Sequence, residues 1–163
     1  MTANLPPCGL YRTASPVANV PAGRLVYFHN HGNPGPGIYL PEKWTNNRAH
    51  FAPNGHTMPT DFDPAVLLPV PPEGFYRVTS AFHCCEKKCV QYEPEAFVQL
   101  GYNGAGRALL FVPELGTGSI DVPDRGTFID DTAFPHLSLL QVAERKAAEG
   151  AGNLSLPRGI VVH

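Results

Sequence analysis

Charge is scarce in this sequence. Only 16% of its 163 residues are charged, against about 25% in an average globular protein, and the formal net charge at pH 7 is −2. The basic residues form no Lys/Arg-rich run, so the chain lacks the positive surface that binds nucleic acid or anionic lipid. We therefore expect neither nucleic acid nor a membrane among its partners.

Long apolar runs and export features are missing as well. No apolar stretch approaches the roughly 18 residues of a membrane-spanning helix. The first residues, Met1 to Pro7, have neither the basic nor the apolar region of a secretory signal. The four cysteines are unevenly spread, with three of them between Cys84 and Cys89, which is not the pattern of a disulfide framework. These features predict a cytoplasmic protein with reduced thiols.

Proline and glycine are abundant instead. The chain has 18 Pro and 16 Gly, which favours many turns and few long helices. Its length predicts a single domain over residues 1–163. The stretch 53–72 contains six prolines, and because proline removes a ladder donor we expect an ordered internal loop there.

Short segments rich in β-branched and aromatic residues predict strands. The best hairpin joins 96–102 to 107–112 through Asn103, Gly104, Ala105 and Gly106, which suit the positive-φ positions of a tight turn. The other expected strands are 8–13, 24–29, 38–40, 75–82, 119–122, 127–129 and an edge strand at 159–162.

One α-helix is expected near the C-terminus, over about 136–149. Leu139, Leu140, Ala143 and Ala147 recur at helical spacing, and Gly150 would end the helix. Short strands, Pro/Gly-rich loops and one late helix together predict a mainly β fold. We expect a compact SH3-like or partly open β-barrel, or a sandwich, with a C-terminal α-helix.

Histidine and cysteine provide the main candidates for chemistry. The candidate metal ligands are His29, His31, His83, Cys84, Cys85 and Cys89. His29 and His31 lie two apart at a strand end, so both rings should face one side, and zinc prefers imidazole and thiolate donors. We hypothesise that this pair meets ligands from the 83–89 cluster across neighbouring strands. Four ligands would close a structural site, and three would leave a position for water.

Other readings of these residues remain open. Clustered cysteines also occur as small buried hydrophobic residues. Cys85 or Cys89 could act as a nucleophile, with His29, His83 or His136 as its base, but no cysteine-enzyme signature surrounds either residue. The adjacent Cys84 and Cys85 could also respond to oxidants.

No convincing catalytic set is present, so we do not expect an enzyme. The sequence favours a structural or protein-interaction subunit of a homo- or hetero-oligomer, because surfaces poor in charge are typical of interface centres. We expect either no cofactor or a structural zinc ion. The alternative function is a metal-dependent enzyme, with zinc or iron, or a metal-binding module built on the His/Cys cluster.

Overall fold

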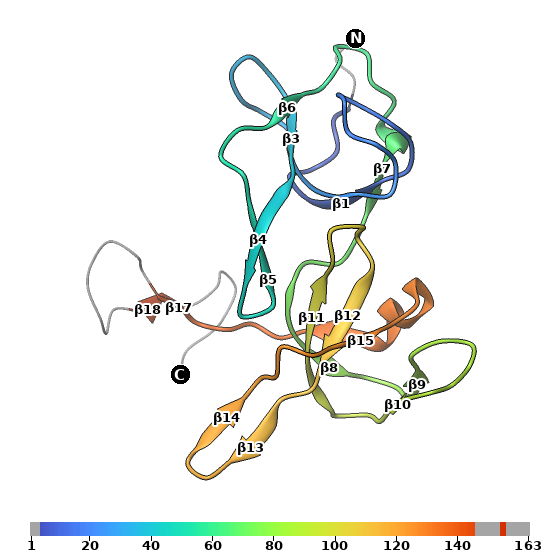
Figure 1. The fold of residues 1–163 in the computed structure, drawn as a ribbon, viewed down its shortest axis with the longest axis vertical. Helices are drawn as coiled ribbons and strands as arrows, with labels where there is room; N and C mark the ends of the chain where they lie inside the picture. The colour runs from blue at the N-terminus through green and yellow to red at the C-terminus, as the bar shows by residue number, and fades with distance from the viewer. Residues whose placement is uncertain (1–3, 146–153, 156–163) are drawn as a thin grey trace.

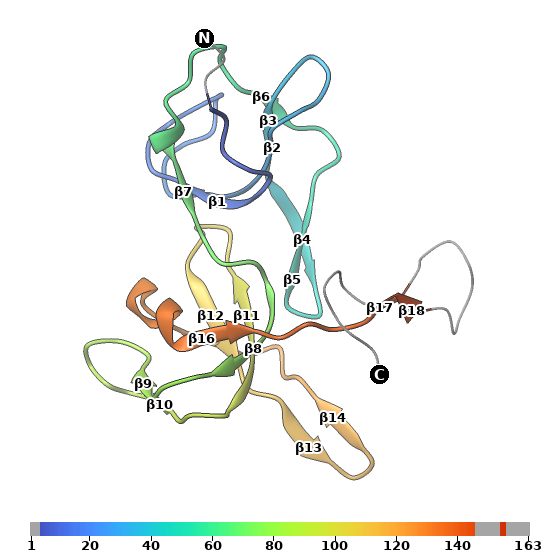
Figure 2. The ribbon, with the colours of Figure 1, turned by 180° about the vertical axis from the view of Figure 1, so that it is seen from behind.

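The computed structural model describes residues 4–145 and 154–155, and within them the chain is mainly antiparallel β-structure. Two five-stranded sheets dominate the views in Figures 1 and 2. The first has the order β6-β3-β2-β1-β7. Its strands are β1 (Gly9–Thr13), β2 (Leu25–His29), β3 (Gly37–Tyr39), β6 (His56–Thr57) and β7 (Leu67–Pro69), with the 3-10 helix η1 (Pro64–Val66) leading into β7.

The second sheet has the order β15-β12-β11-β8-β16. Its strands are β8 (Gly74–Val78), β11 (Phe97–Tyr102), β12 (Ala108–Phe111), β15 (Thr127–Phe128) and β16 (Leu137–Leu139). The predicted hairpin is confirmed, because β11 pairs with β12 from Gln99 opposite Phe111 to Tyr102 opposite Ala108. The described sheets are open, so the closed form of the expected barrel does not occur.

Four two-stranded ladders complete the described strand structure outside the two large sheets. They are β4–β5 (Pro41–Thr45 and Arg48–Phe51), β9–β10 (Phe82–His83 and Gln91–Tyr92), β13–β14 (Glu114–Gly116 and Ser119–Asp121) and β17–β18 (Glu144–Arg145 and Leu154–Ser155). Each pair is antiparallel. All four project from, or lie beside, the larger sheets in Figure 1.

The buried apolar residues form two clusters, one for each large sheet, and strand β2 contributes to both. Alternate side chains of a strand point to opposite faces, and here Val26 and Phe28 pack in a cluster with Ile38, while Leu25 packs with the residues of the second sheet. Leu25, Val26 and Phe28 are all fully buried. The two sheets therefore share an interface, and β2 is rigidly held on both of its faces.

The hairpin β4–β5 has no counterpart among the predicted strands. Its turn residues Asn46 and Asn47 both have positive φ (52° and 66°), which is the backbone of a tight hairpin turn and a position that asparagine tolerates. The turn lies against β11, where Gln99 Nε2 donates to Asn46 O at 3.0 Å and Asn47 Nδ2 donates to Gln99 Oε1 at 3.0 Å. Residue 101 is glycine at this approach, since a Cβ there would lie 2.8 Å from Asn47 O.

The Pro-rich stretch 53–72 is ordered and connects the two sheets. It contains β6, η1 and β7 rather than one continuous loop. Its last two prolines accept hydrogen bonds from buried tyrosines of the second sheet, with Tyr102 Oη donating to Pro71 O and Tyr76 Oη donating to Pro72 O, each at 2.6 Å. Proline has no N–H, but its carbonyl remains a full acceptor.

The predicted helix over 136–149 is wrong for the part that the structure describes. Asp131–His136 is a 3-10 helix (η2), and Leu137–Leu139 is β16, paired with β8 so that Leu137 lies opposite Val78. As a strand, residues 137–139 form backbone hydrogen bonds along the edge of β8. A short amphipathic helix is only marginally stable, so the strand is the more stable state of this segment. Residues 146–149 and the expected strand 159–162 lie outside the described residues.

No helix in the described part of the chain is long and apolar enough to cross a membrane.

Candidate metal centre

His29 and His31 lie side by side at the end of β2. His29 is the last residue of that strand, and its ring centroid is 4.0 Å from that of His31, with the rings tilted by 46°. The His29 side chain is half-buried and that of His31 is exposed. The two imidazoles therefore share one face of the chain at the rim of the first sheet.

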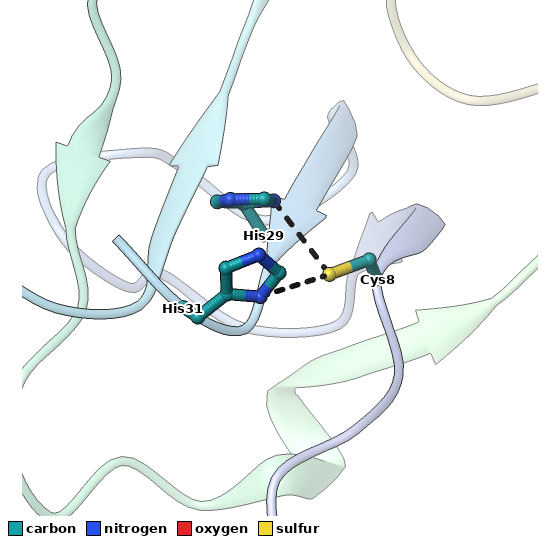
Figure 3. A group of neighbouring side chains, drawn as sticks. All are labelled: Cys8, His29 and His31. Carbon is teal, nitrogen blue, oxygen red and sulfur yellow. Dashed lines mark hydrogen bonds between the residues drawn. The ribbon is translucent and has the colours of Figure 1, made fainter.

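Cys8 brings a thiol to the same place. It immediately precedes β1, and the antiparallel pairing of Gly9 with Phe28 sets Cys8 beside the end of β2. Its Sγ lies 3.6 Å from His29 Nδ1 and 3.9 Å from His31 Nδ1. Figure 3 shows the sulfur to one side of the two adjacent rings, with a dashed line to one nitrogen of each ring.

These distances match those of a tetrahedral metal site. A zinc ion with bonds of about 2.3 Å to sulfur and about 2.05 Å to nitrogen separates these two ligand atoms by about 3.6 Å. The three residues each offer a donor atom within 4.8 Å of the others, and within residues 4–145 and 154–155 no other group of three meets this criterion. Cys8, His29 and His31 thus form a group of donors that could hold a metal ion.

Asn30 contacts two of the three donor residues, Cys8 and His31. Its backbone N–H donates to Cys8 Sγ at 3.3 Å, and its side-chain Nδ2 donates to Pro6 O at 3.2 Å. Its Oδ1 accepts from Cys8 Sγ at 3.2 Å and lies 2.7 Å from His31 Nδ1. Asn30 therefore fixes the segment before β1 against the turn after β2, and it supplies an oxygen at the edge of the donor group.

The 83–89 cluster lies elsewhere. His83 is in β9, while Cys84, Cys85 and Cys89 belong to the turn between β9 and β10, and these two strands pair only with each other. In Figures 1 and 2 this hairpin and the first sheet occupy different ends of the molecule. The structure does not bring His29 and His31 together with the 83–89 residues, because their donor group contains Cys8 instead and β9 pairs only with β10.

Sequence reasoning missed Cys8, although a signal was present. Segments 8–13 and 24–29 were both expected to be strands, and an antiparallel pair in which Gly9 meets Phe28 places residue 8 opposite residue 29. Nothing in the sequence alone specifies that register. The thiol was overlooked because its neighbours in the chain are not metal ligands.

The β9–β10 turn gathers three thiols of its own. Cys84 is buried and its Sγ donates to Cys85 Sγ at 3.6 Å, while the Val90 N–H donates to Cys84 Sγ at 3.3 Å. Hydrogen bonds from the Cys84 thiol and from the backbone of Lys87 and Cys89 lower the pKa of Cys85. The nearby charge of Cys85 raises the pKa of Cys89.

A separate cleft contains a carboxyl group. It has a volume of about 700 Å³ and is lined by Arg48, Glu73, Gln99 and residues 139–144. Burial raises the pKa of Glu73, and this is partly offset by the Ala49 N–H, which donates to Glu73 Oε2 at 3.0 Å. The hydrogen bond to Ala49 gives Glu73 a structural role, since it fixes β5 beside the start of β8.

Comparisons with known proteins give no relative for this chain. It matches no protein-family model, and searches against curated proteins and solved structures return no match. The function must therefore be argued from the site itself.

Proposed function

We propose that the protein binds one zinc ion through Cys8, His29 and His31, and that the ion fastens the segment before β1 to the end of β2. The observation that supports this proposal is the spacing of the three donors, with Cys8 Sγ 3.6 and 3.9 Å from the two Nδ1 atoms. One thiolate and two imidazoles are borderline-soft donors, which suit zinc better than magnesium or calcium.

The site has three side-chain donors from the protein and an exposed side at His31. A fourth position is then open to water or to Asn30 Oδ1, which already lies at hydrogen-bond distance from Cys8 and His31. The proposed role is structural, since Asn30 and the ion would together join two segments 21 residues apart in the chain. An open fourth position is also what a catalytic zinc site requires.

Metal titration of the purified full chain tests the proposal. After removal of metal with a chelator, the chain is titrated with zinc against a chromophoric competitor, and with cobalt to detect thiolate ligation by its charge-transfer absorption. We expect one equivalent of tight zinc and a cobalt–thiolate band. Cys8→Ser and His29→Ala should each weaken zinc binding by at least about 100-fold, since losing a ligand should cost more than losing a supporting residue.

Two matched variants serve as controls. His50 is exposed on β5 and Cys89 is exposed in the β9–β10 turn, and neither belongs to the donor group. His50→Ala and Cys89→Ser should therefore bind zinc as the parent does. Loss of zinc in Cys89→Ser with retention in Cys8→Ser would move the site to the 83–89 cluster and overturn the proposal.

A second candidate function is self-association, favoured by the β13–β14 hairpin. Leu115 and Ile120 are paired directly across this hairpin and are 86% and 62% exposed. Two large apolar side chains on one face of a protruding hairpin form a self-complementary patch that a two-fold dimer would bury. Light scattering should give twice 17.6 kDa for the parent and 17.6 kDa for the double variant Leu115→Ser/Ile120→Ser. A parent of 17.6 kDa at micromolar concentration would exclude this function.

A further inference from the structure

The turn between β9 and β10 is closed by two backbone hydrogen bonds. Cys84 N donates to Val90 O and Lys88 N donates to Cys85 O, each at 2.9 Å, so a tight turn spans Cys85 to Lys88. Lys88 has a positive φ of 55°, which reverses the chain direction just before Cys89. This reversal places the next residue, Cys89, beside Cys85, where the turn began.

The Cys84 thiol donates to Cys85 Sγ at 3.6 Å. The hydrogen bond from Cys84, together with the backbone of Lys87 and Cys89, lowers the pKa of Cys85. A sulfur that accepts several hydrogen bonds is stabilised as a thiolate, which is the reactive form of cysteine. The two hydrogen bonds that close the turn, Lys88 N to Cys85 O and Cys84 N to Val90 O, bring Cys89 back beside Cys85, and the Cys89 side chain is among the groups that lower the Cys85 pKa.

The three cysteines of the turn differ in access. Cys84 is 2% exposed and packs in the apolar cluster of the second sheet, whereas Cys85 is half-buried and Cys89 is exposed. Solvent-borne reagents therefore reach Cys85 and Cys89 but not Cys84. Between Cys85 and Cys89, the exposed Lys87 and Lys88 outweigh the exposed Glu86 by one positive charge, which favours an anionic reagent.

We propose that Cys85 and Cys89 form a reversible redox-active dithiol, in which Cys85 attacks a small anionic disulfide of the glutathione type and Cys89 resolves the product. This inference does not depend on the proposed zinc site, which uses other residues. It assigns a modification site to the turn. Cys84 acts as a positioning residue, because its thiol donates to Cys85 without being exposed to the reagent.

The chemistry balances as two successive exchanges. The Cys85 thiolate attacks one sulfur of glutathione disulfide, and a Cys85–glutathione bond forms while the other glutathione leaves as a thiolate and takes up the proton that Cys85 released. Cys89 then loses its proton to solvent and attacks the Cys85 sulfur, which forms the Cys85–Cys89 bond, and the second glutathione leaves as a thiolate that takes up a proton from solvent. Two protein thiols are oxidised, and one glutathione disulfide is reduced to two glutathione molecules.

Peptide mapping of the full chain tests the proposal. The reduced protein is incubated with glutathione redox buffers in the presence of a chelator, alkylated, and digested with trypsin without reduction. Cleavage after Lys87 and Lys88 separates Cys85 from Cys89, so that their peptides remain joined only if the disulfide has formed. We expect the joined peptide in the parent and its loss after treatment with dithiothreitol.

Three serine variants assign the roles. Cys85→Ser should form neither the joined peptide nor a glutathione adduct in this region, whereas Cys89→Ser should accumulate one glutathione on the peptide ending at Lys87. Cys84→Ser keeps a hydroxyl donor and should form the joined peptide within about twofold of the parent rate, since Cys84 is shielded from the reagent.

Several outcomes would overturn the proposal. One is the absence of a joined peptide in the parent under conditions that fully modify Cys8. Another is a joined peptide that persists in Cys85→Ser, which would assign the disulfide to Cys84. A third outcome combines two observations: the parent forms the disulfide only in the presence of the chelator, and one equivalent of zinc fully protects the turn of Cys8→Ser from oxidation. That outcome would identify the turn as a metal site.

Discussion

The two ends of the molecule bring cysteine to its chemical neighbours in opposite ways. At the first sheet, Cys8 meets His29 and His31 only because β1 pairs with β2, across more than twenty residues of chain. In the β9–β10 turn, Cys84, Cys85 and Cys89 meet within a single turn, held by the local hydrogen bonds of that turn. The first cluster therefore depends on tertiary pairing, and the second depends on a short hairpin. The difference teaches that a variant which loosens the pairing of β1 with β2 should affect the first cluster more than the second.

The largest effect is expected from the core under the first sheet. Phe28 is fully buried beside Tyr11 and Phe62, with ring centroids 5.9 Å away in each case. Phe28→Ala should lower the free energy of unfolding by about 3–5 kcal/mol, measured by urea denaturation, because it leaves a large cavity. Zinc affinity should fall with it while the Cys85–Cys89 disulfide still forms in the folded fraction. An equal loss of both properties would contradict the contrast between the clusters.

Zinc itself should stabilise the protein through the first cluster. At a free zinc concentration 100 times its dissociation constant, the free energy of unfolding should rise by about 2.7 kcal/mol, because zinc binds the folded chain. The gain should be absent in Cys8→Ser and intact in Cys89→Ser, as measured by thermal unfolding with and without zinc. A gain of the same size in both variants would show that zinc binds elsewhere.

The contact between the two sheets should have an intermediate effect. Arg12 of β1 forms a bidentate pair with Asp131 (2.7 and 3.1 Å) and donates to Gly106 O (3.0 and 2.7 Å). Arg12→Ala removes these charged hydrogen bonds and should cost about 1.5–3 kcal/mol. Arg24→Ala is the matched control, since Arg24 makes one longer bond, of 3.3 Å, to Gly104 O. Equal losses for the two variants would show that the bidentate pair contributes little.

The smallest effect is a pH dependence at the same contact. The hydrogen bond from Arg12 lowers the pKa of Asp131 below its ordinary value of 3.8. The unfolded chain then binds more protons than the folded chain in this range, so the stabilisation is present above about pH 3.8 and is lost as the pH falls through the folded-state pKa. Asp131 is 55% exposed, so the loss should stay below about 1 kcal/mol. Asp131→Asn should flatten the acid limb of stability against pH, and an unchanged limb would remove Asp131 as its cause.

Much of the strand content was readable from local patterns. The segments 8–13, 24–29 and 96–112 are strands because β-branched and aromatic residues alternate between turn residues, and their boundaries agree closely with β1, β2 and β11–β12. The β4–β5 hairpin was missed because its strands contain charged residues, although the Asn46-Asn47 pair is a recognisable turn signal. The segment 137–139 shows the opposite error, since its leucines also suit a helix and only pairing with β8 decides for a strand.

The sequence by itself determined a mainly β chain, the position of its clearest hairpin, the joint orientation of His29 and His31, and the thiol-rich turn, because each of these depends on residues a few positions apart. Only the tertiary structure decided which sulfur reaches the two imidazoles, how the Pro-rich stretch joins the sheets, and where the C-terminal leucines lie. Those features depend on strand register and on which sheet edge is free, and both are set by the packing of the whole chain rather than by any local pattern.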